Sequence, residues 1–198
     1  MTAAGTPAAA AAVVAAAALA APARLGGVRL LAVDGPSGAG KSTFADRVVE
    51  ALRARAARTV LLRTDDFATW DDPVAWWPRL RDGVLAPYAE GRPGRYRRVE
   101  WPDGRPVPGE YVDVEVPDVL VLEGVSAGRA SVRPSLAHLS WLPGPDAATR
   151  LERAVARDGE PSRAPLTRWQ AFERGWFAID QPHLRADTSF GAGQLGDS

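Results

Sequence analysis

Residues 28–44 read VRLLAVDGPSGAGKSTF, and this stretch decides the fold of the chain. Its first seven residues are mostly apolar, which predicts a buried parallel strand that ends at Asp34. Residues 35–42, GPSGAGKS, match the pattern G-x-x-x-x-G-K-[ST] at every position. Residues 43–57 carry apolar side chains on one side of a predicted helix. A strand, a glycine-rich loop and a helix in this order form the context that a phosphate-binding loop requires.

Each residue type in this loop has a physical reason to be there. The glycines let the backbone turn so that successive N–H groups face an anion, and the helix N-terminus favours negative charge. Lys41, the only lysine in the chain, is suited to bridge the β- and γ-phosphates, and the Ser42 hydroxyl is suited to hold Mg²⁺. The sequence therefore predicts an ATP–Mg²⁺ site made by Gly35, Ser37, Gly38, Ala39, Gly40, Lys41, Ser42 and Thr43.

Carboxylates follow two further predicted strands, residues 59–63 and 119–123. The carboxyl ends of parallel strands meet at one edge of a sheet, so these groups are expected beside the phosphate loop. Asp65 is expected to orient or deprotonate an acceptor hydroxyl and to assist with Mg²⁺, although spacing alone does not separate it from Asp66. Glu123 is predicted to contact Mg²⁺ through water or to orient Asp65. The alternatives are a helix cap for Asp65 and a plain strand end for Glu123.

A predicted helix over residues 146–157 places Arg150, Arg153 and Arg157 on one face, and Arg163 follows it. Phosphoryl transfer needs cations around the moving charge, and a closing lid that carries arginine supplies them. Arg153 and Arg157 are the preferred pair for this role. The alternative is a solvated basic face with acidic partners on the same helix.

The element order predicts an α/β protein, a P-loop NTPase three-layer fold with about five parallel strands. Residues 68–117 hold four of the seven tryptophans and many prolines and glycines, and we expect an irregular insertion with one hairpin that covers the substrate. The other aromatic side chains are expected to serve packing, Trp169 among them. The predicted parts are an Ala-rich helix or extension at 1–26, a kinase domain at 27–190 with a lid region at 150–163, and a loose tail at 191–198.

Composition narrows the classes of partner. The 198 residues carry 24 basic and 24 acidic side chains, so no global charge favours nucleic acid or an anionic membrane surface. The chain has no cysteine, which excludes disulfides, thiolate zinc sites and thiol nucleophiles. No lysine or arginine precedes the alanine run at the start, which argues against a secretory signal. The expected location is cytoplasmic, the expected partner is a small molecule, and a homo-oligomer is left open.

Five strings in order, VDGPSGAGKSTFA, TDDF, WDDP, VLVLEGV and DAATRLERAVARD, resemble uridine kinases and their relatives among phosphoribulokinase-like P-loop kinases. The resemblance spans about residues 28–190. Many P-loop kinases share the first string, and its combination with D-x-F and LEG is more specific. The resemblance implies ATP- and Mg²⁺-dependent transfer of the γ-phosphoryl group to a nucleoside such as uridine or cytidine.

The resemblance also implies roles for individual residues. Asp65 matches the catalytic aspartate of the family, and Glu123 and Arg157 match its glutamate near Mg²⁺ and its lid arginine. Asp71 matches the aspartate that holds the ribose hydroxyls, and Tyr96 matches the tyrosine that stacks near the base. The family often has a base-reading histidine where this chain has Trp101. This departure concerns the acceptor, so a sugar, a pantothenate-like compound or a nucleoside monophosphate remains an alternative, as do a nucleotide switch and a non-catalytic nucleotide-binding protein.

Overall fold

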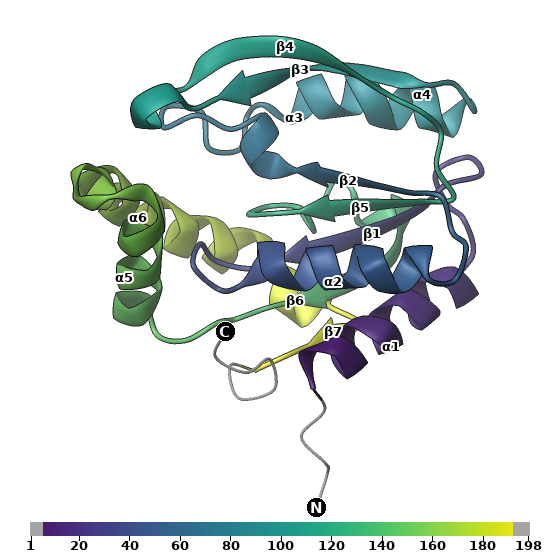
Figure 1. Cartoon of the computed structure of the whole chain (residues 1–198), viewed down its shortest axis with the longest axis horizontal. Coiled ribbons are helices and arrows are strands. Elements are labelled where there is room, and N and C mark those ends of the chain that lie inside the picture. The colour runs from purple at the N-terminus through teal and green to yellow at the C-terminus, as the bar shows by residue number, and fades with distance from the viewer. Residues whose placement is uncertain (1–5, 192–198) are drawn as a thin grey trace, which may run out of the picture.

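The computed structural model describes residues 6–191, and its centre is a sheet in which every neighbouring pair of strands runs parallel. The strand order is β2-β5-β1-β6-β7, so β1 lies in the middle (Figure 1). The loop that follows β1 therefore leaves from the centre of one sheet edge. The strands are β1 (Arg29–Asp34), β2 (Thr59–Arg63), β5 (Val119–Glu123), β6 (Leu136–Trp141) and β7 (Thr188–Ser189).

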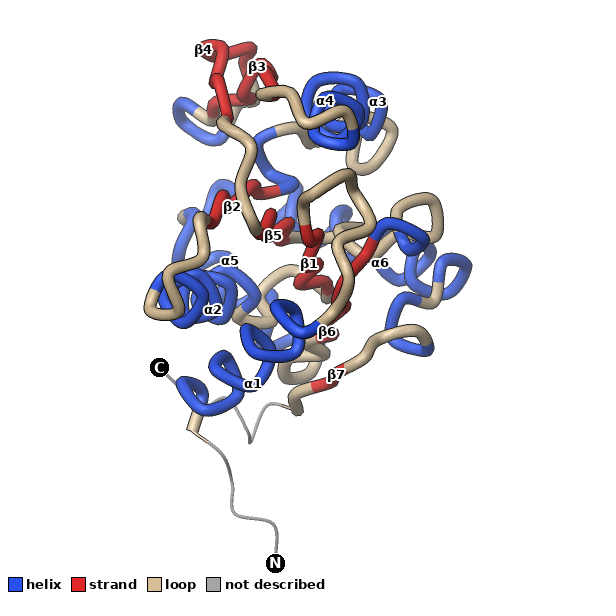
Figure 2. The backbone as a smooth tube through the Cα atoms, turned by 90° about the vertical axis from the view of Figure 1, so that its right-hand side faces the viewer, coloured by secondary structure: helices blue, strands red, loops and turns tan. Residues whose placement is uncertain are grey.

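Helices α1 (Pro7–Ala20) and α2 (Lys41–Arg53) lie together on one face of the sheet (Figure 2). Successive side chains of β1 point to opposite faces, as the period of a strand requires. Leu31 and Val33 pack toward α1 and α2, whereas Leu30 and Ala32 join the core on the other face. Both faces of the strand are buried, which explains why its sequence is an almost continuous apolar run. The predicted three-layer α/β fold is confirmed.

The alanine-rich start of the chain forms a helix that packs on the domain. The Thr6 hydroxyl caps α1 by accepting the N–H of Ala9 at 3.2 Å, and Pro7 occupies the first helical position. Small side chains on one side of α1 are buried against α2 and the sheet. No helix between residues 6 and 191 is long and apolar enough to cross a membrane. Residues 1–5, and the predicted tail beyond Gly191, lie outside the described residues.

The opposite face of the sheet is covered by the segment that interrupts the alternation of strands and helices. The predicted hairpin is present as β3 (Gly94–Glu100) and β4 (Val107–Val114), at the top of Figure 1. The expectation of an otherwise irregular insertion is wrong. Residues 77–89 are helical throughout, as α3 (Trp77–Leu80), a π-helical stretch (Arg81–Leu85) and α4 (Ala86–Ala89).

The helical stretch of the insertion is hard to recognise in the sequence, because it contains two prolines and a glycine. Leu80, Val84, Leu85 and Tyr88 form the buried stripe of residues 77–89, at helical spacing. Pro78 stands within the first turn of this stretch, where the missing N–H costs little, and Pro87 follows the π-helical residues 81–85. The π-helical turn between them absorbs the local irregularity. Burial against the sheet thus outweighs a local sequence that disfavours helix.

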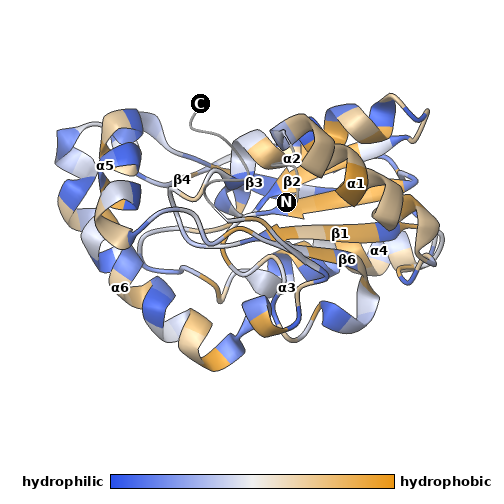
Figure 3. Ribbon diagram, turned by 90° about the horizontal axis from the view of Figure 1, so that it is seen from below, coloured by the Kyte–Doolittle hydropathy of each residue, from blue (hydrophilic) through white to orange (hydrophobic). Residues whose placement is uncertain are grey.

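Helices α5 (Ala147–Asp158) and α6 (Arg163–Asp180) stand at the carboxyl edge of the sheet (Figure 1), and we refer to this pair as the lid. The predicted lid region, residues 150–163, spans most of α5 and the turn after it, and its closing role stays a prediction. Asp146 caps α5 by accepting the N–H of Thr149 at 3.0 Å. A small core of Ala154, Val155 and Leu166 holds the pair together. Figure 3 shows that hydrophobic residues concentrate in the strands, whereas α5 and α6 carry many hydrophilic ones. Single 3₁₀ turns are formed by Thr64–Asp66, Pro102–Gly104, Arg133–Ser135, Glu160–Ser162 and Pro182–Leu184.

Candidate active site

The phosphate loop leaves β1 and enters α2 in the conformation that its glycines allow. Gly38 has φ 74° and Gly40 has φ 87°, in the left-handed region that favours glycine. A Cβ on Gly38 would lie 2.5 Å from the carbonyl oxygen of Arg150, so α5 approaches the loop too closely for a side chain. Gly40 precedes the first residue of α2, whose N-terminus therefore faces the site with its free N–H groups. The sequence prediction of a loop that opens onto a helix is confirmed.

Lys41 lies at the first position of α2, where its side chain is largely buried. Its ammonium group donates to the carbonyl oxygen of Pro36 at 3.0 Å, across the concave side of the loop. The lysine is thus already folded over the loop that it serves. Its amine lies where a phosphate held by the loop N–H groups would find a positive charge.

Asp34 fastens the phosphate loop to the loop that follows β5, a role that the sequence did not indicate. Its carboxylate is fully buried and accepts the N–H groups of Gly35 at 2.7 Å, Ser126 at 3.1 Å and Gly128 at 2.9 Å. Burial raises the pKa of Asp34 to about 7, and the backbone hydrogen bonds and Lys41 oppose that rise. The signal in the sequence was an acidic residue at the end of an apolar strand, the same signal that marked Glu123.

Glu123 and Ser42 lie together, as expected for residues that share a metal ion. The Ser42 hydroxyl donates to Glu123 Oε2 at 3.2 Å, and Arg63 Nε lies 3.4 Å from the same oxygen. Burial raises the pKa of Glu123, while nearby Lys41 opposes the rise. A hydroxyl and a buried carboxylate are hard oxygen donors that suit Mg²⁺. Within residues 6–191 no group of three or more histidine or acidic side chains lies close enough together to hold a metal ion.

The two neighbouring aspartates after β2 have different surroundings, which separates their roles. Asp66 accepts the Tyr96 hydroxyl at 2.6 Å and pairs with Arg98 at 3.4 Å, so it serves the contact with β3. Asp65 is exposed and lines both cavities described below. The spacing left this choice open, and the placement favours Asp65 as the carboxylate that faces a reactant.

Two cavities meet at the edge of the sheet. The first, of about 530 Å³, is lined by the phosphate loop, Glu123 and the lid arginines, and we call it the donor cavity. The second, of about 460 Å³, is lined by the insertion and the lid, and we call it the acceptor cavity. The two cavities share Ser37, Asp65 and Arg157. A group bound in one cavity can therefore reach a group in the other at these three residues.

The lid arginines divide into two kinds. Arg153 and Arg157 line the donor cavity, as the sequence predicted for a lid pair. Arg157 donates to both carboxylate oxygens of Asp158 at 2.6 and 2.7 Å, and this contact raises the pKa of its guanidinium, with Asp65 and Glu123 adding to the rise. Arg150 instead donates to the carbonyl oxygen of Ser37 at 3.3 Å, and Arg163 pairs with Glu152 and Glu160.

The acceptor cavity has walls of tryptophan. Trp70, Trp101 and Trp169 line it, and Trp70 meets the other two edge to face at ring separations of 5.2 and 5.9 Å. All three indole N–H groups donate to protein acceptors. Trp70 donates to the main-chain carbonyl oxygen of Gly104 at 3.0 Å, and Trp101 donates to that of Asp65 at 3.3 Å. Trp169 donates to the carboxylate of Glu173 at 2.7 Å. The tryptophan walls therefore present aromatic ring carbons to the cavity, because their N–H donors are already used within the protein. Trp101, a predicted substrate residue, lines this cavity, and Trp169, which was expected to serve packing, lines it as well.

Two other predicted substrate residues line neither cavity. The Tyr96 ring is buried against Phe67 at 4.8 Å, and burial raises its pKa above the usual range. Asp71 is exposed on the loop before α3, where the neighbouring Asp72 caps the N–H of Trp76 at 3.0 Å. The roles of all the predicted site residues stay predictions, and the two cavities are lined by every one of these residues except Gly35, Asp71 and Tyr96.

Comparison with solved structures supports the architecture. A protein from Bacillus stearothermophilus, provisionally named as a uridine kinase, shares 17% identity and a TM-score of 0.60, over 82% of this chain and 88% of that one. A protein from Silicibacter sp. TM1040, provisionally named as a fructose transport system kinase, shares 18% identity and a TM-score of 0.69, over 91% of this chain and 98% of that one. No family model matches the chain, and no curated protein matches it by sequence. The chain thus has the α/β P-loop fold of these kinases, in agreement with the resemblance in its sequence motifs.

Proposed function

We propose that the chain is an ATP- and Mg²⁺-dependent kinase that phosphorylates a hydroxyl of a small uncharged metabolite, with a nucleoside such as uridine or cytidine as the first candidate. The observation that carries the proposal is the meeting of two cavities at Ser37, Asp65 and Arg157. A nucleotide switch needs only the donor cavity, whereas a kinase needs a second space for its acceptor. The solved structures that share the fold include proteins named as kinases of small molecules.

The residues of the donor cavity suggest how ATP is held. Backbone N–H groups of the loop and the start of α2 bind the phosphates, and Lys41 bridges the β- and γ-phosphates. Ser42, Glu123 and Asp65 would hold Mg²⁺, which would offset charge on the phosphate oxygens. Arg153 and Arg157 lie on the lid side of the same cavity and stabilise negative charge that spreads over the transferring group.

The transfer itself is a displacement at phosphorus. The acceptor hydroxyl oxygen forms a bond to the γ-phosphorus, the bond from this phosphorus to the β–γ bridging oxygen breaks, and ADP leaves. Asp65, at the junction of the cavities, orients the hydroxyl and takes its proton. Because this reaction consumes ATP, we place the enzyme in the cytoplasm.

The acceptor cavity favours an uncharged molecule with a flat face. Its walls are indole rings with Leu166 and Ala68, and its ionisable groups include the carboxylates Asp65 and Asp158. Among the described residues that line it, Arg157 is the single cation, and its Nε and Nη2 both donate to the carboxylate of Asp158. Hydroxyl groups on a ring suit carboxylates and aromatic faces. A phosphate or carboxylate on the acceptor would have to share this one cation with the transferring phosphoryl group, which disfavours nucleoside monophosphates and pantothenate-like compounds.

The test is ATP consumption by the purified protein with a panel of nucleosides, ring sugars, their monophosphates and pantothenate, with mass detection of the product. We expect a monophosphate from an uncharged acceptor, formed only with Mg²⁺. Turnover restricted to anionic acceptors would contradict the assignment of the acceptor cavity. ATP binding without turnover for any acceptor would contradict the kinase proposal.

A further inference from the structure

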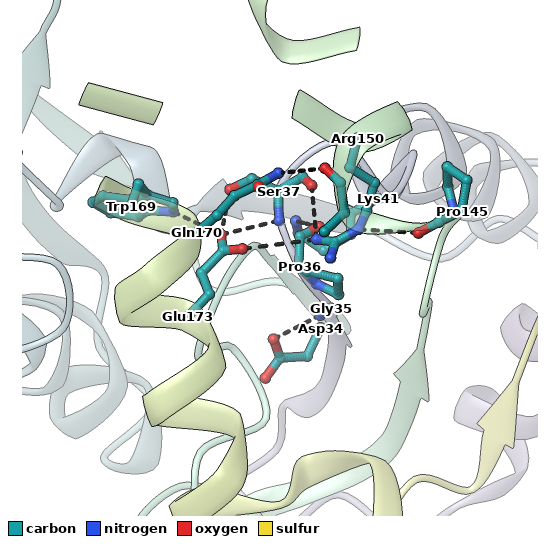
Figure 4. A network of polar contacts seen from close by, with 11 residues as sticks. Asp34, Gly35, Pro36, Ser37, Lys41, Pro145, Arg150, Trp169, Gln170 and Glu173 are labelled. Carbon is teal, nitrogen blue, oxygen red and sulfur yellow. Dashed lines mark hydrogen bonds and ion pairs between the residues drawn. The ribbon is translucent and has the colours of Figure 1, made fainter. Parts of the chain in front are cut away.

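One buried carboxylate joins the lid to the phosphate loop. Glu173 lies on α6 and is 2% exposed. Its Oε1 accepts the Ser37 N–H at 3.0 Å, the Ser37 hydroxyl, and the indole N–H of Trp169 at 2.7 Å (Figure 4). An acidic residue in the aromatic stripe of a helix was the sign of this site in the sequence, because residues 169 and 173 are one turn apart.

The hydrogen bonds of Glu173 are unevenly shared between its two oxygens. Oε1 accepts three donors, whereas Oε2 is buried without a hydrogen-bond partner and lies 3.9 Å from Nη1 of Arg150. A buried carboxylate that served the fold alone would be expected to satisfy both oxygens. The arrangement instead concentrates the interaction on Ser37.

The lid holds both polar groups of the Ser37 main chain. The N–H is bound by Glu173 from α6, and the carbonyl oxygen accepts from Arg150 of α5 at 3.3 Å. Arg150 also donates to the Pro145 oxygen at 3.1 Å, which anchors it at the start of its own helix. The orientation of the Ser37 peptide therefore depends on where the lid lies.

Ser37 lines both cavities, and Trp169 is a wall of the acceptor cavity. The contacts Trp169–Glu173–Ser37 thus run from the acceptor wall to the phosphate loop. From this geometry we infer that Glu173 is a positioning residue that couples occupation of the acceptor cavity to the conformation of the phosphate loop. That an acceptor occupies the second cavity rests on the proposed function. That the phosphate loop responds through Glu173 requires only that Mg-ATP binds.

The coupling also runs in reverse, which gives a test without an acceptor. Mg-ATP bound to the loop should change the surroundings of the Trp169 indole and so its fluorescence. We expect an ATP-dependent change in tryptophan emission in the wild type that W169F and E173A both lose, while calorimetry shows that both variants still bind Mg-ATP. The matched control is W141F, because Trp141 packs against Phe177 on α6 at 4.9 Å and lines neither cavity.

The outcomes separate the two proposals. A wild type that binds no Mg-ATP would overturn the proposed function and the coupling together. Mg-ATP binding with an emission change that survives in W169F or E173A would overturn the coupling alone. A loss of the change in W141F as well would assign it to general packing of α6, which also contradicts the coupling.

Kinetics with the acceptor found in the panel give the second test. W169F keeps the aromatic wall and removes the N–H, so we expect kcat to fall about tenfold, the effect of one lost hydrogen bond to a charged group. The acceptor KM should change less than about threefold. In the E173A background W169F should have no further effect on kcat, because E173A has already removed the contact from Trp169 through residue 173 to Ser37. Additive losses, or a W169F variant that raises only the acceptor KM, would show that Trp169 is a wall and nothing more.

Substitution of Glu173 by glutamine tests whether its role depends on the hydrogen bonds that Oε1 accepts. E173Q keeps a carbonyl oxygen for the three donors, so it should recover most of the kcat that E173A loses and keep the ATP-dependent emission change. Equal losses in E173Q and E173A, with unchanged thermal unfolding, would contradict a role based on hydrogen bonds to Oε1.

Discussion

The donor and acceptor cavities are built in opposite ways. The donor cavity is built around one local segment: residues 37–44 supply eight consecutive positions among its nineteen lining residues, and one strand and one helix hold this segment. The acceptor cavity is assembled from distant parts of the chain: Ser37 of the phosphate loop, residues 65–70, residues 101–104 of the hairpin and residues 157–169 of the lid. A binding site for a common donor can be encoded in one short motif, whereas the acceptor site depends on how long-range packing brings side chains together.

The largest expected effect lies on the local side. Lys41→Ala removes the loop cation, and we expect kcat/KM for ATP to fall about a hundredfold to a thousandfold with every acceptor. Lys41→Arg is the matched control, because it keeps the charge but not the compact shape that fits over Pro36, and it should recover little. Steady-state kinetics with two acceptors check this. A loss confined to one acceptor would break the division between the cavities.

The junction should show the next effect. Asp65→Asn removes the proposed proton acceptor, and kcat should fall about a hundredfold or more. The control is Asp66→Asn at the neighbouring position, which disturbs the contacts to Tyr96 and Arg98. It should lower the unfolding temperature and leave kcat nearly unchanged. Paired kinetic and thermal unfolding measurements test both. The reverse result would exchange the roles of the two aspartates.

On the acceptor side the expected effect is smaller and confined to one reactant. Trp101→Ala removes a wall of the acceptor cavity, so the KM for the acceptor should rise about tenfold, while the KM for ATP stays within about twofold. Trp101→Phe keeps an aromatic ring but loses the hydrogen bond to the main-chain oxygen of Asp65. Comparison of the two variants therefore separates the effect of the ring from the effect of that hydrogen bond. Equal changes in both KM values would show that the cavities are not independent.

A further effect concerns the pH dependence of stability and Asp34, which links the phosphate loop to the loop after β5. The pKa of Asp34 is raised from 3.8 to about 7, so the folded protein holds this proton at pH values where the unfolded chain has lost it. The contribution of Asp34 to stability must therefore fall as pH rises from about 4 to about 7, by at most about 1.4 kcal/mol per pH unit. Urea unfolding at several pH values should show this slope in the wild type and lose it in Asp34→Asn. An unchanged slope in the variant would show that Asp34 is not the group that titrates.

Much of the fold was predictable because its signals are local. The strands β2 and β5 have the predicted bounds, and the loop has the predicted context, because an apolar run and a glycine motif act within a few residues. The helical stretch 77–89 was not predictable, because its local sequence contains prolines and only burial against the sheet stabilises it.

The site divides in the same way. Lys41, Ser42, Glu123 and Asp65 could be predicted since each stands in a motif or directly after a strand of a parallel sheet. The choice between Asp65 and Asp66 needed the contact that Tyr96 makes, from a strand thirty residues away. Glu173 could not be assigned, because its partner Ser37 lies 136 residues earlier in the chain.

The sequence by itself determined that the chain forms a P-loop α/β protein and where its phosphate loop lies. Backbone turns, helix N-termini and buried strands depend on neighbouring residues, so their pattern is visible in the chain. Only the tertiary structure decided which tryptophans surround the acceptor cavity and which carboxylate holds Ser37. Those choices depend on the packing of α5 and α6 against the loop, and contacts between residues far apart in the chain leave no periodic trace in it.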